Sequence, residues 1–138
     1  MNLHLHFDVP GDDFTRAGEA SDNVKRKLKE LGFDPTIIRR TAIALYEAEI
    51  NMVIHAGGGA VEADILPNSV TITLTDHGPG IPDVEKAMQE GFSTAPDNIR
   101  ALGFGAGMGL PNIKKYTDSM HIDTVLGEGT TITFSVNA

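Results

Sequence analysis

The strongest constraint on the fold is the order in which two hydrophobic periods follow one another along the 138 residues. Helical spacing of apolar side chains occupies 14–31 and 35–55, and Asp34-Pro35 marks the start of the second helix. Period-two alternation, typical of strands with one buried face, occurs in five segments: 2–9, 60–66, 69–76, 119–126 and 130–136. This order predicts an α+β fold, a two-layer α/β sandwich with helices on one face of a mixed, mainly antiparallel sheet.

The connections between these segments refine the prediction. Pro67-Asn68 and Gly127-Glu128-Gly129 predict two hairpins, and segment 2–9 is expected at an edge of the sheet. The remaining predicted segments are a short helix over 83–90, an irregular lid over 91–104 and a helix at about 110–117. No repeat or internal boundary interrupts the chain, so 1–138 is expected to form a single domain.

Composition excludes several classes of protein. Cysteine is absent, which excludes a disulfide, a thiolate zinc site and a cysteine nucleophile, and a reducing, cytoplasmic location is expected. No segment approaches the roughly 20 apolar residues of a membrane helix, and the start of the chain lacks the basic and apolar regions of a signal peptide. The formal net charge of -8 opposes direct nucleic-acid binding, although a small phosphate ligand needs only a local positive site.

A run of alternating glycines is the most distinctive motif. Gly103, Gly105, Gly107 and Gly109 precede a predicted helix, where backbone amides can close on phosphate oxygens. No Lys-Ser or Lys-Thr follows, so this is no Walker motif, and the βαβ context of a dinucleotide fingerprint is missing. A flexible hinge is the alternative interpretation of this run.

A second motif follows the third predicted strand, where Asp76 precedes Gly78-Pro79-Gly80. An ordinary turn, in which the aspartate hydrogen-bonds its own backbone, is one explanation of this pattern. The other is a ligand contact, because the glycines let the main chain approach a flat ligand. A carboxylate there accepts a hydrogen bond from an exocyclic amine such as that of adenine.

A third motif lies on the long predicted helix, where Glu47, Asn51 and His55 follow one another at i, i+4 and share one face. Glu47 is a candidate general base, and the amide oxygen of Asn51 is a candidate ligand of Mg²⁺, which prefers oxygen ligands. Taken alone, this spacing also fits an exposed helix face, and His55 also fits a helix-end histidine with no catalytic role.

In this order and at these separations, the three motifs resemble the GHKL or Bergerat-type ATP-binding family. The nearest resemblance is to its branch of anti-sigma factors and switch kinases, small bacterial serine/threonine protein kinases. The resemblance spans nearly the whole chain and is specific over 76–111, in segments 76–83, 91–94 and 105–111. Two features depart from the branch: the stretch 95–102 is longer than expected, and Gly57-Gly58-Gly59 follows the motif helix.

The resemblance implies a role for particular residues. Glu47 would activate the acceptor hydroxyl, Asn51 would bind Mg²⁺, and Asp76 would accept from the adenine amino group. The further nucleotide-binding residues that it implies are Gly78 and Gly80 beside the base, Gly105, Gly107, Gly109 and Leu110 at the phosphates, Arg100 in the lid and Thr130 behind the adenine.

These roles predict a Bergerat-fold protein that binds ATP and Mg²⁺ and transfers the γ-phosphoryl group to a serine or threonine of a partner protein. The resemblance implies a sigma factor or an anti-sigma antagonist-like protein as that partner, without direct contact with nucleic acid or membrane, and a homodimer is left open. Two alternatives remain. One is a non-catalytic, nucleotide-gated anti-sigma-like binding module, and the other is a detached histidine-kinase-type ATPase domain.

Two other clusters are interpreted more simply. His4 and His6 alternate on one strand face, and a solvent-exposed face is favoured over a metal site because no third ligand is near in sequence. The basic residues Lys25, Arg26, Lys27 and Lys29 fit a solvated helix face, with contact to an acidic partner as the alternative.

Overall fold

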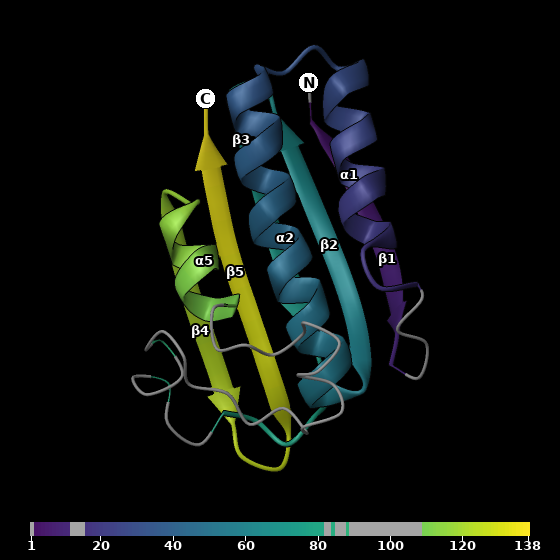
Figure 1. The fold of residues 1–138 in the computed structure, drawn as a ribbon, viewed down its shortest axis with the longest axis vertical. Helices are drawn as coiled ribbons and strands as arrows, with labels where there is room; N and C mark the ends of the chain where they lie inside the picture. The colour runs from purple at the N-terminus through teal and green to yellow at the C-terminus, as the bar shows by residue number, and fades with distance from the viewer. Residues whose placement is uncertain (1, 12–15, 82–83, 85–87, 89–108) are drawn as a thin grey trace.

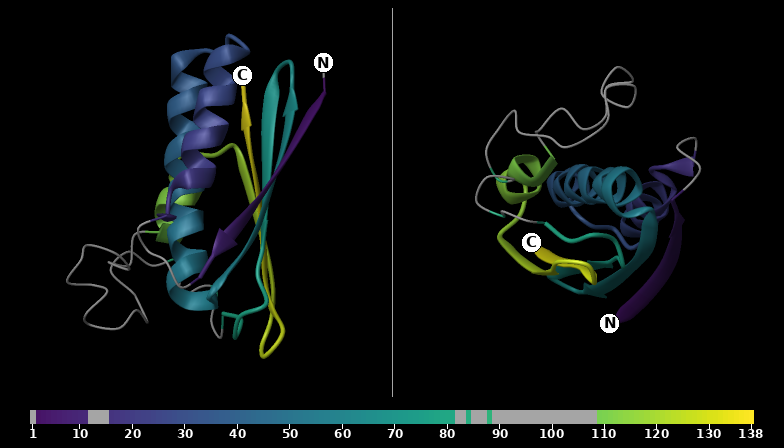
Figure 2. Two further views of the ribbon diagram at one scale, coloured as in Figure 1. Left: turned by 90° about the vertical axis from the view of Figure 1, so that its right-hand side faces the viewer. Right: turned by 90° about the horizontal axis from the view of Figure 1, so that it is seen from below.

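A computed structural model describes residues 2–11, 16–81, 84, 88 and 109–138. These residues form two layers, a layer of helices and a five-stranded sheet with one face against them (Figures 1 and 2). The helices are α1 (Glu19–Glu30), α2 (Pro35–Ala56) and α5 (Gly109–Lys115). The strands are β1 (Leu3–Pro10), β2 (Gly58–Leu66), β3 (Ser69–Thr75), β4 (Ser119–Val125) and β5 (Gly129–Asn137), in the order β1-β2-β3-β5-β4.

The predicted fold class is confirmed, with one difference in the sheet. Every strand pair in the described chain is antiparallel, whereas a mixed sheet was expected. The reason is the place of the last hairpin: β5 takes the inner position beside β3, and β4 lies outside it. Had β4 been next to β3, the two strands would have run parallel. Both predicted hairpins and the edge position of β1 are present.

The long helix begins and ends where its local sequence predicts. The carboxylate of Asp34 accepts from Thr36 N–H (2.8 Å), Pro35 occupies the first turn, and Gly57 adopts the left-handed conformation (φ 71°) at the C-cap. By contrast, α1 starts at Glu19 and not at residue 14, because Gly18 is itself left-handed (φ 101°) and interrupts the helical backbone. Residues 14 and 15 of that prediction lie outside the described chain.

The core lies between α2 and the inner face of the sheet. Leu45 and Ala48 of α2 are buried there, together with Val24 and Leu28 of α1. The buried side chains of the strands include Val61, Ala63, Ile65, Val70, Ile72, Phe134 and Val136. Because each fully buried aliphatic side chain contributes roughly 1.5–3 kcal/mol, this layer contact is the main source of stability. It also holds α2 in a fixed position against the central strands.

The glycine triplet after α2 permits a close return of the chain into the sheet. Gly58 has a φ of 93°, and a Cβ there would lie 2.2 Å from the carbonyl oxygen of Val9. A side chain at this position would therefore collide with β1 while forcing an unfavourable backbone conformation. The triplet departs from the resembled branch, and the structure explains it: only glycine lets β2 begin directly after the helix.

The two ends of the molecule differ in what they carry. The first residues of β1, the end of β5 and the β2–β3 turn lie together at the upper end in Figure 1, where Ala138 N–H donates to Asn68 O (2.9 Å). The last turn of α2, the end of β3 and the start of β5 lie at the lower end. No helix of the described segments is long and apolar enough to cross a membrane.

Candidate functional site

At the lower end of the sheet, the loop that carries Asp76 meets the last turn of the helix that carries Glu47 and Asn51. The loop after β3 packs on the last turn of α2, since a Cβ on Gly78 would lie 2.6 Å from Cα of Ala56. The same loop is joined to β5, because Asp76 N–H donates to Thr130 O (2.9 Å). Residues far apart in sequence are therefore neighbours, and the Ala56 backbone leaves no room for a side chain at Gly78.

Asp76 has one oxygen fixed and one available. Its Oδ1 accepts from the backbone N–H of Gly78 (3.0 Å) and of Thr130 (3.1 Å). The bond to Gly78 is the one that an ordinary aspartate turn makes, so the structure also agrees with the turn explanation of this motif. Within the described chain, Oδ2 receives no hydrogen bond. The carboxylate is thus oriented by two donors and keeps an acceptor for a ligand amine.

Thr130 lies directly behind this carboxylate. Its side chain is 6% exposed, and its hydroxyl shares a hydrogen bond with Thr124 Oγ1 (2.9 Å). Thr124 Oγ1 in turn accepts from Ile81 N–H (2.8 Å), so the hydroxyl pair ties the β4–β5 hairpin to the loop after Asp76. No motif in the sequence marks Thr124 as part of the site. The hairpin register, which pairs Thr124 with Thr130 across the strands, is the feature from which its place could have been predicted.

The loop between Asp76 and Ile81 is held from a second side by the β4–β5 turn. Gly127 N–H donates to Pro79 O (2.9 Å). Gly80 has a φ of 83°, and a Cβ there would lie 2.8 Å from Val125 O. Gly80 therefore has to be glycine for the loop to lie this close to the hairpin. The loop after Asp76 is thus packed between the β4–β5 hairpin and the last turn of α2, which restricts its conformation.

The face of α2 that carries Glu47, Asn51 and His55 is partly exposed. Glu47 and Asn51 are half-buried, and neither side chain makes a hydrogen bond within the part of the chain that is described. Two functional groups one turn apart are thus available to a ligand. His55 lies on the same face of α2, and burial lowers the pKa of its imidazole.

Glu49 lies on the opposite side of α2 and was given no role by the sequence analysis. It is 1% exposed, and its carboxylate accepts from the backbone N–H groups of Gly18 (2.8 Å), Ala20 (3.3 Å) and Ser21 (3.0 Å). Burial raises the pKa of Glu49, and the three backbone donors oppose that rise. Glu49 therefore caps α1 from a neighbouring helix. The available signal was its place two residues from Glu47, which turns it toward the core.

The other predicted site residues lie in α5 or outside the described chain. Arg100, Gly105 and Gly107 lie outside the described chain, as do most of the 83–90 helix and the 91–104 segment. Gly109 is the first residue of α5. Leu110 is 8% exposed and its side chain packs in the core, so a phosphate contact at this position would come from its backbone.

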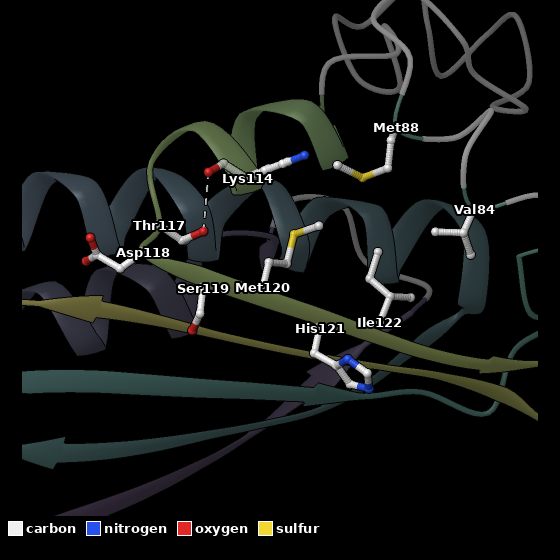
Figure 3. Close-up of a pocket in the computed structure, with 9 residues that line it drawn as sticks. All are labelled: Val84, Met88, Lys114, Thr117, Asp118, Ser119, Met120, His121 and Ile122. Carbon is white, nitrogen blue, oxygen red and sulfur yellow. Dashed lines mark hydrogen bonds between the residues drawn. The ribbon is translucent and has the colours of Figure 1, made fainter.

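A groove of about 420 Å³ lies elsewhere, between α5 and β4 (Figure 3). Its lining includes Met88, Lys114, Met120 and Ile122, and none of the residues of the three motifs. Within the described segments, no group of three His, Asp or Glu side chains is arranged to hold a metal ion. A metal beside Asn51 would therefore need ligands beyond the described side chains, such as phosphate oxygens.

Comparison with known proteins decides the family. A family model described as the histidine kinase-like ATPase domain matches residues 12–136. This chain belongs to that family. Among its relatives, the serine/threonine-protein kinase RsbT of Bacillus subtilis is 36% identical over 124 residues, which cover 87% of this chain and 85% of the relative. An anti-sigma F factor of Caldanaerobacter subterraneus is 39% identical over 106 residues, covering 72% of this chain and 71% of the relative.

A solved structure supports the fold. The crystal structure of the RsbU and RsbW domains of a Mycobacterium tuberculosis protein aligns with a TM-score of 0.66 over 98% of this chain, at 19% identity. The match covers 32% of that longer chain. The histidine kinase-like ATPase family and its partner-switching relatives thus agree with the resemblance inferred from the three motifs.

Proposed function

We propose that this chain binds ATP with Mg²⁺ at the site formed by the Asp76 loop and by the α2 face that carries Glu47 and Asn51. We propose further that it transfers the γ-phosphoryl group to a serine or threonine of a partner protein. The observation that carries the proposal is the state of Asp76, whose Oδ1 is fixed by two backbone donors while Oδ2 stays open. The adenine amino group would donate to Oδ2. Thr130 would support the base from behind, and Gly78 and Gly80 would lie beside it.

The donor set on α2 fits a magnesium nucleotide. The Asn51 side chain supplies an oxygen of the kind that Mg²⁺ prefers, and it has no competing hydrogen bond within the described chain. When bound, Mg²⁺ neutralises charge on the transferring phosphate. Backbone amides of Gly105, Gly107 and Gly109, and Arg100, would hold the phosphate oxygens as the family resemblance implies. These assignments remain predictions.

Glu47 would carry the proton step. The acceptor hydroxyl oxygen attacks the γ-phosphorus, the bond to the β–γ bridging oxygen breaks, and ADP leaves with that electron pair. The hydroxyl proton passes to the Glu47 carboxylate, which lies one turn before Asn51 and is not hydrogen-bonded in the described chain. Positioning supplies most of the acceleration in this chemistry. The packed loop after Asp76 and the buried face of α2 would hold the reacting groups in place.

The names of the relatives support a protein partner. One relative is named a serine/threonine-protein kinase and another an anti-sigma F factor, so we propose a partner of the sigma-factor or anti-sigma-antagonist class. The alternative function is a binding module that holds its partner only when nucleotide is bound and transfers nothing, and the second name fits its binding of a sigma-factor-like partner. A homodimer and a cytoplasmic location stay predictions.

Calorimetric titration of ATP and ADP with Mg²⁺ tests the adenine contact. Asp76→Asn should weaken binding about tenfold or more, because the loss of a charge-assisted hydrogen bond in a partly buried site costs roughly 1.5–3 kcal/mol. Asp64→Asn, on the outer face of β2, is the matched control and should bind as wild type does. If wild type binds neither nucleotide, the proposed site is wrong.

A second variant separates the kinase from the binding module. Glu47→Ala should keep ATP affinity within about threefold and lose transfer of a labelled γ-phosphate to a protein that co-purifies with the chain, by about a hundredfold or more. Transfer that is undiminished in Glu47→Ala would exclude Glu47 as the base. Partner capture that depends on ATP, with no transfer in either protein, would support the alternative.

A further inference from the structure

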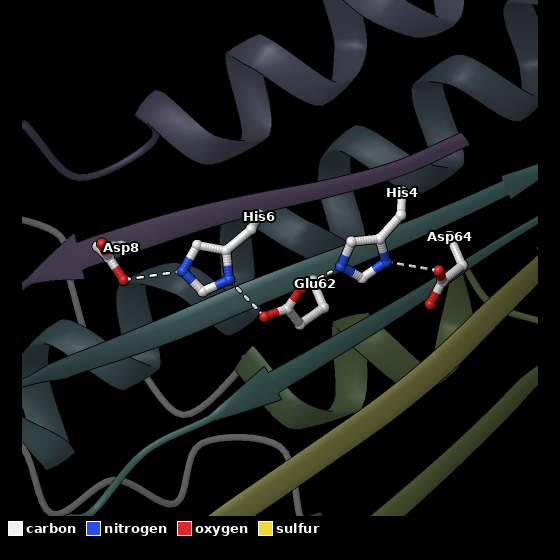
Figure 4. Close-up of polar contacts among 5 residues, drawn as sticks. All are labelled: His4, His6, Asp8, Glu62 and Asp64. Atoms are coloured by element: carbon white, nitrogen blue, oxygen red, sulfur yellow. Dashed lines mark hydrogen bonds and ion pairs between the residues drawn. The ribbon is translucent and has the colours of Figure 1, made fainter.

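The outer face of the edge strand carries an unusual set of alternating side chains. His4, His6 and Asp8 project from β1 on the face away from the helices, and the register places His4 opposite Asp64 and His6 opposite Glu62 of β2. Figure 4 shows these side chains converging into one line along the two strands. Sequence alone favoured a plain solvent face here, because the two carboxylates of β2 come from a distant segment.

The five side chains form a continuous ladder of contacts, which we call the histidine–carboxylate ladder. Asp8 Oδ1 contacts His6 Nε2 (3.0 Å), and His6 Nδ1 contacts Glu62 Oε1. Glu62 Oε2 contacts His4 Nε2 (2.5 Å), and His4 Nδ1 contacts Asp64 Oδ1 (2.7 Å). Glu62 is thus the central member, because it touches both histidines.

This arrangement specifies the protonation state of the rings. All four ring nitrogens face a carboxylate oxygen, and an ionised carboxylate can only accept hydrogen bonds. A neutral imidazole has one N–H and one lone pair, so it would turn a lone pair toward an anion. The contacts are therefore all favourable only when both histidines are imidazolium ions. The hydrogen bonds accordingly raise the pKa of His4 and His6, and those from His6 and His4 lower the pKa of Glu62.

No charged side chain of the next strand competes with these contacts. On the same face, β3 places Thr71 beside Asp64 and Thr73 beside Glu62, and both are uncharged. As the edge strand, β1 has no further strand on its other side. The ladder therefore changes from a net charge of -1, with three carboxylates and two imidazoliums, to -3 when both histidines lose their protons.

The strand that bears the ladder depends on it more than an inner strand would. β1 is hydrogen-bonded to β2 alone, and on its inner face Leu3, Leu5 and Phe7 are only half-buried. It ends opposite Gly58, immediately after the C-cap of the helix that carries Glu47 and Asn51. The cross-strand charges thus add to the backbone pairing of β1 with β2, a contact that ends beside the C-cap of α2.

We propose that the histidine–carboxylate ladder is a proton-dependent clasp, which holds β1 against β2 while His4 and His6 are protonated and loosens the edge strand when they are not. Because the folded-state pKa of each histidine lies above 6.5, its stabilisation is complete below that value and is lost as pH rises through the folded-state pKa. The carboxylate of Glu62 sets the lower limit, since its contribution is lost as pH falls through its own lowered pKa.

Titration of the histidine ring protons by NMR tests the connectivity of the ladder. Wild-type His4 and His6 should both titrate above 6.5. Glu62→Gln should lower the midpoints of both rings, whereas Asp64→Asn should lower that of His4 and Asp8→Asn that of His6. Asp123→Asn removes a carboxylate that contacts a histidine outside the ladder (His121 Nε2, 3.1 Å), so it is the matched control and should leave the midpoints of His4 and His6 unchanged. A Glu62→Gln variant that moves neither ring would overturn the proposal.

Amide hydrogen exchange tests the clasp itself. Between pH 6 and pH 8.5, the protection factors of the β1 amides should fall about twofold to tenfold in wild type, as expected for weak exposed ion pairs. Those of β3 and β5 should change less. In the double variant His4→Gln/His6→Gln, protection of β1 should be low and independent of pH. Equal pH dependence of β1 protection in wild type and double variant would show that the ladder does not hold the strand.

Discussion

At the scale of single residues, α2 gives two glutamates that stand two positions apart entirely different surroundings. Glu47 is half-buried and makes no hydrogen bond in the described chain, whereas Glu49 is buried with three backbone donors. The difference follows from helix geometry, which turns residues i and i+2 to opposite sides. A carboxylate kept without partners is available for chemistry, and one that is fully satisfied serves the fold.

A buried hydroxyl in the same helix should be dispensable. Thr41 is 0% exposed, and its Oγ1 is the buried side-chain polar atom without a hydrogen-bond partner in the described chain. Thr41→Val removes the unsatisfied group and fills the same space with a methyl, so the free energy of unfolding should rise by about 1 kcal/mol. Urea denaturation measures it. Thr133→Val on the outer face of β5 is the control, expected within about 0.5 kcal/mol of wild type.

At the scale of elements, the start of α1 depends on an acceptor from another helix. Gly18 contributes no capping side chain, and the carboxylate of Glu49 takes the backbone donors that a cap would normally receive. Glu49→Gln replaces one acceptor oxygen by an NH₂ group that faces N–H donors, so the free energy of unfolding should fall by about 1–3 kcal/mol. Hydrogen exchange should show the loss first at the α1 amides. Glu47→Gln, with no such contacts, should leave stability near that of wild type.

Titration of the same carboxyl has a defined sign. Because burial raises the pKa of Glu49 in the folded state, its contribution to stability is complete below the unfolded pKa of about 4.3 and declines as pH rises through the folded value. The stability difference between wild type and Glu49→Gln should therefore be largest in acid and shrink toward neutral pH. A difference that grows toward neutral pH would mean that the backbone donors outweigh burial.

The elements that the sequence predicted are those with local signals. Asp34-Pro35 begins α2 and Gly57 ends it, and both signals are local residues that the sequence shows directly. The late start of α1 was not predicted, because it depends on Gly18 and on Glu49 from another helix. The antiparallel order of the whole sheet also escaped prediction, since hairpin signals say which strands pair but not which strand of a hairpin lies inside.

At the scale of the whole molecule, one ionic network joins the two layers. Arg40 of α2 donates to Tyr116 O (3.2 Å) and to Asp118 Oδ2 (3.2 Å), and the same oxygen accepts from Asn137 N–H (2.7 Å) at the end of β5. The Asn137 donor first, and then Arg40, lower the pKa of Asp118. Its stabilisation is therefore present above an unfolded pKa of about 3.9 and lost as pH falls through the lower folded value.

This network predicts a modest sensitivity to acid. Asp118→Asn should lower the free energy of unfolding at pH 7 by less than about 1 kcal/mol, because the pair is partly exposed. The variant should also lose less stability than wild type between pH 5 and pH 3. Thermal unfolding at several pH values measures both effects. Asp123→Asn, on the open face of β4, is the control and should follow the wild-type curve.

The candidate site residues could be proposed from the sequence, but their arrangement could not. Glu47, Asn51 and Asp76 were proposed from their motifs and the family resemblance, and the structure places the loop after Asp76 against the last turn of α2. The Thr124–Thr130 hydroxyl pair needs the strand register, which no single motif contains. Leu110 illustrates the converse case, since a residue within a recognised motif turned out to have its side chain in the core.

Both ends of the chain leave the fold beside the β2–β3 turn, away from Asp76 and the last turn of α2 (Figure 1). With nine residues in β5, at about 3.3 Å each, the two ends of the sheet are roughly 30 Å apart. A tag or linker attached at either end would therefore start at the end of the fold opposite the candidate site. In the Mycobacterium tuberculosis structure, the matched part makes up 32% of a longer chain.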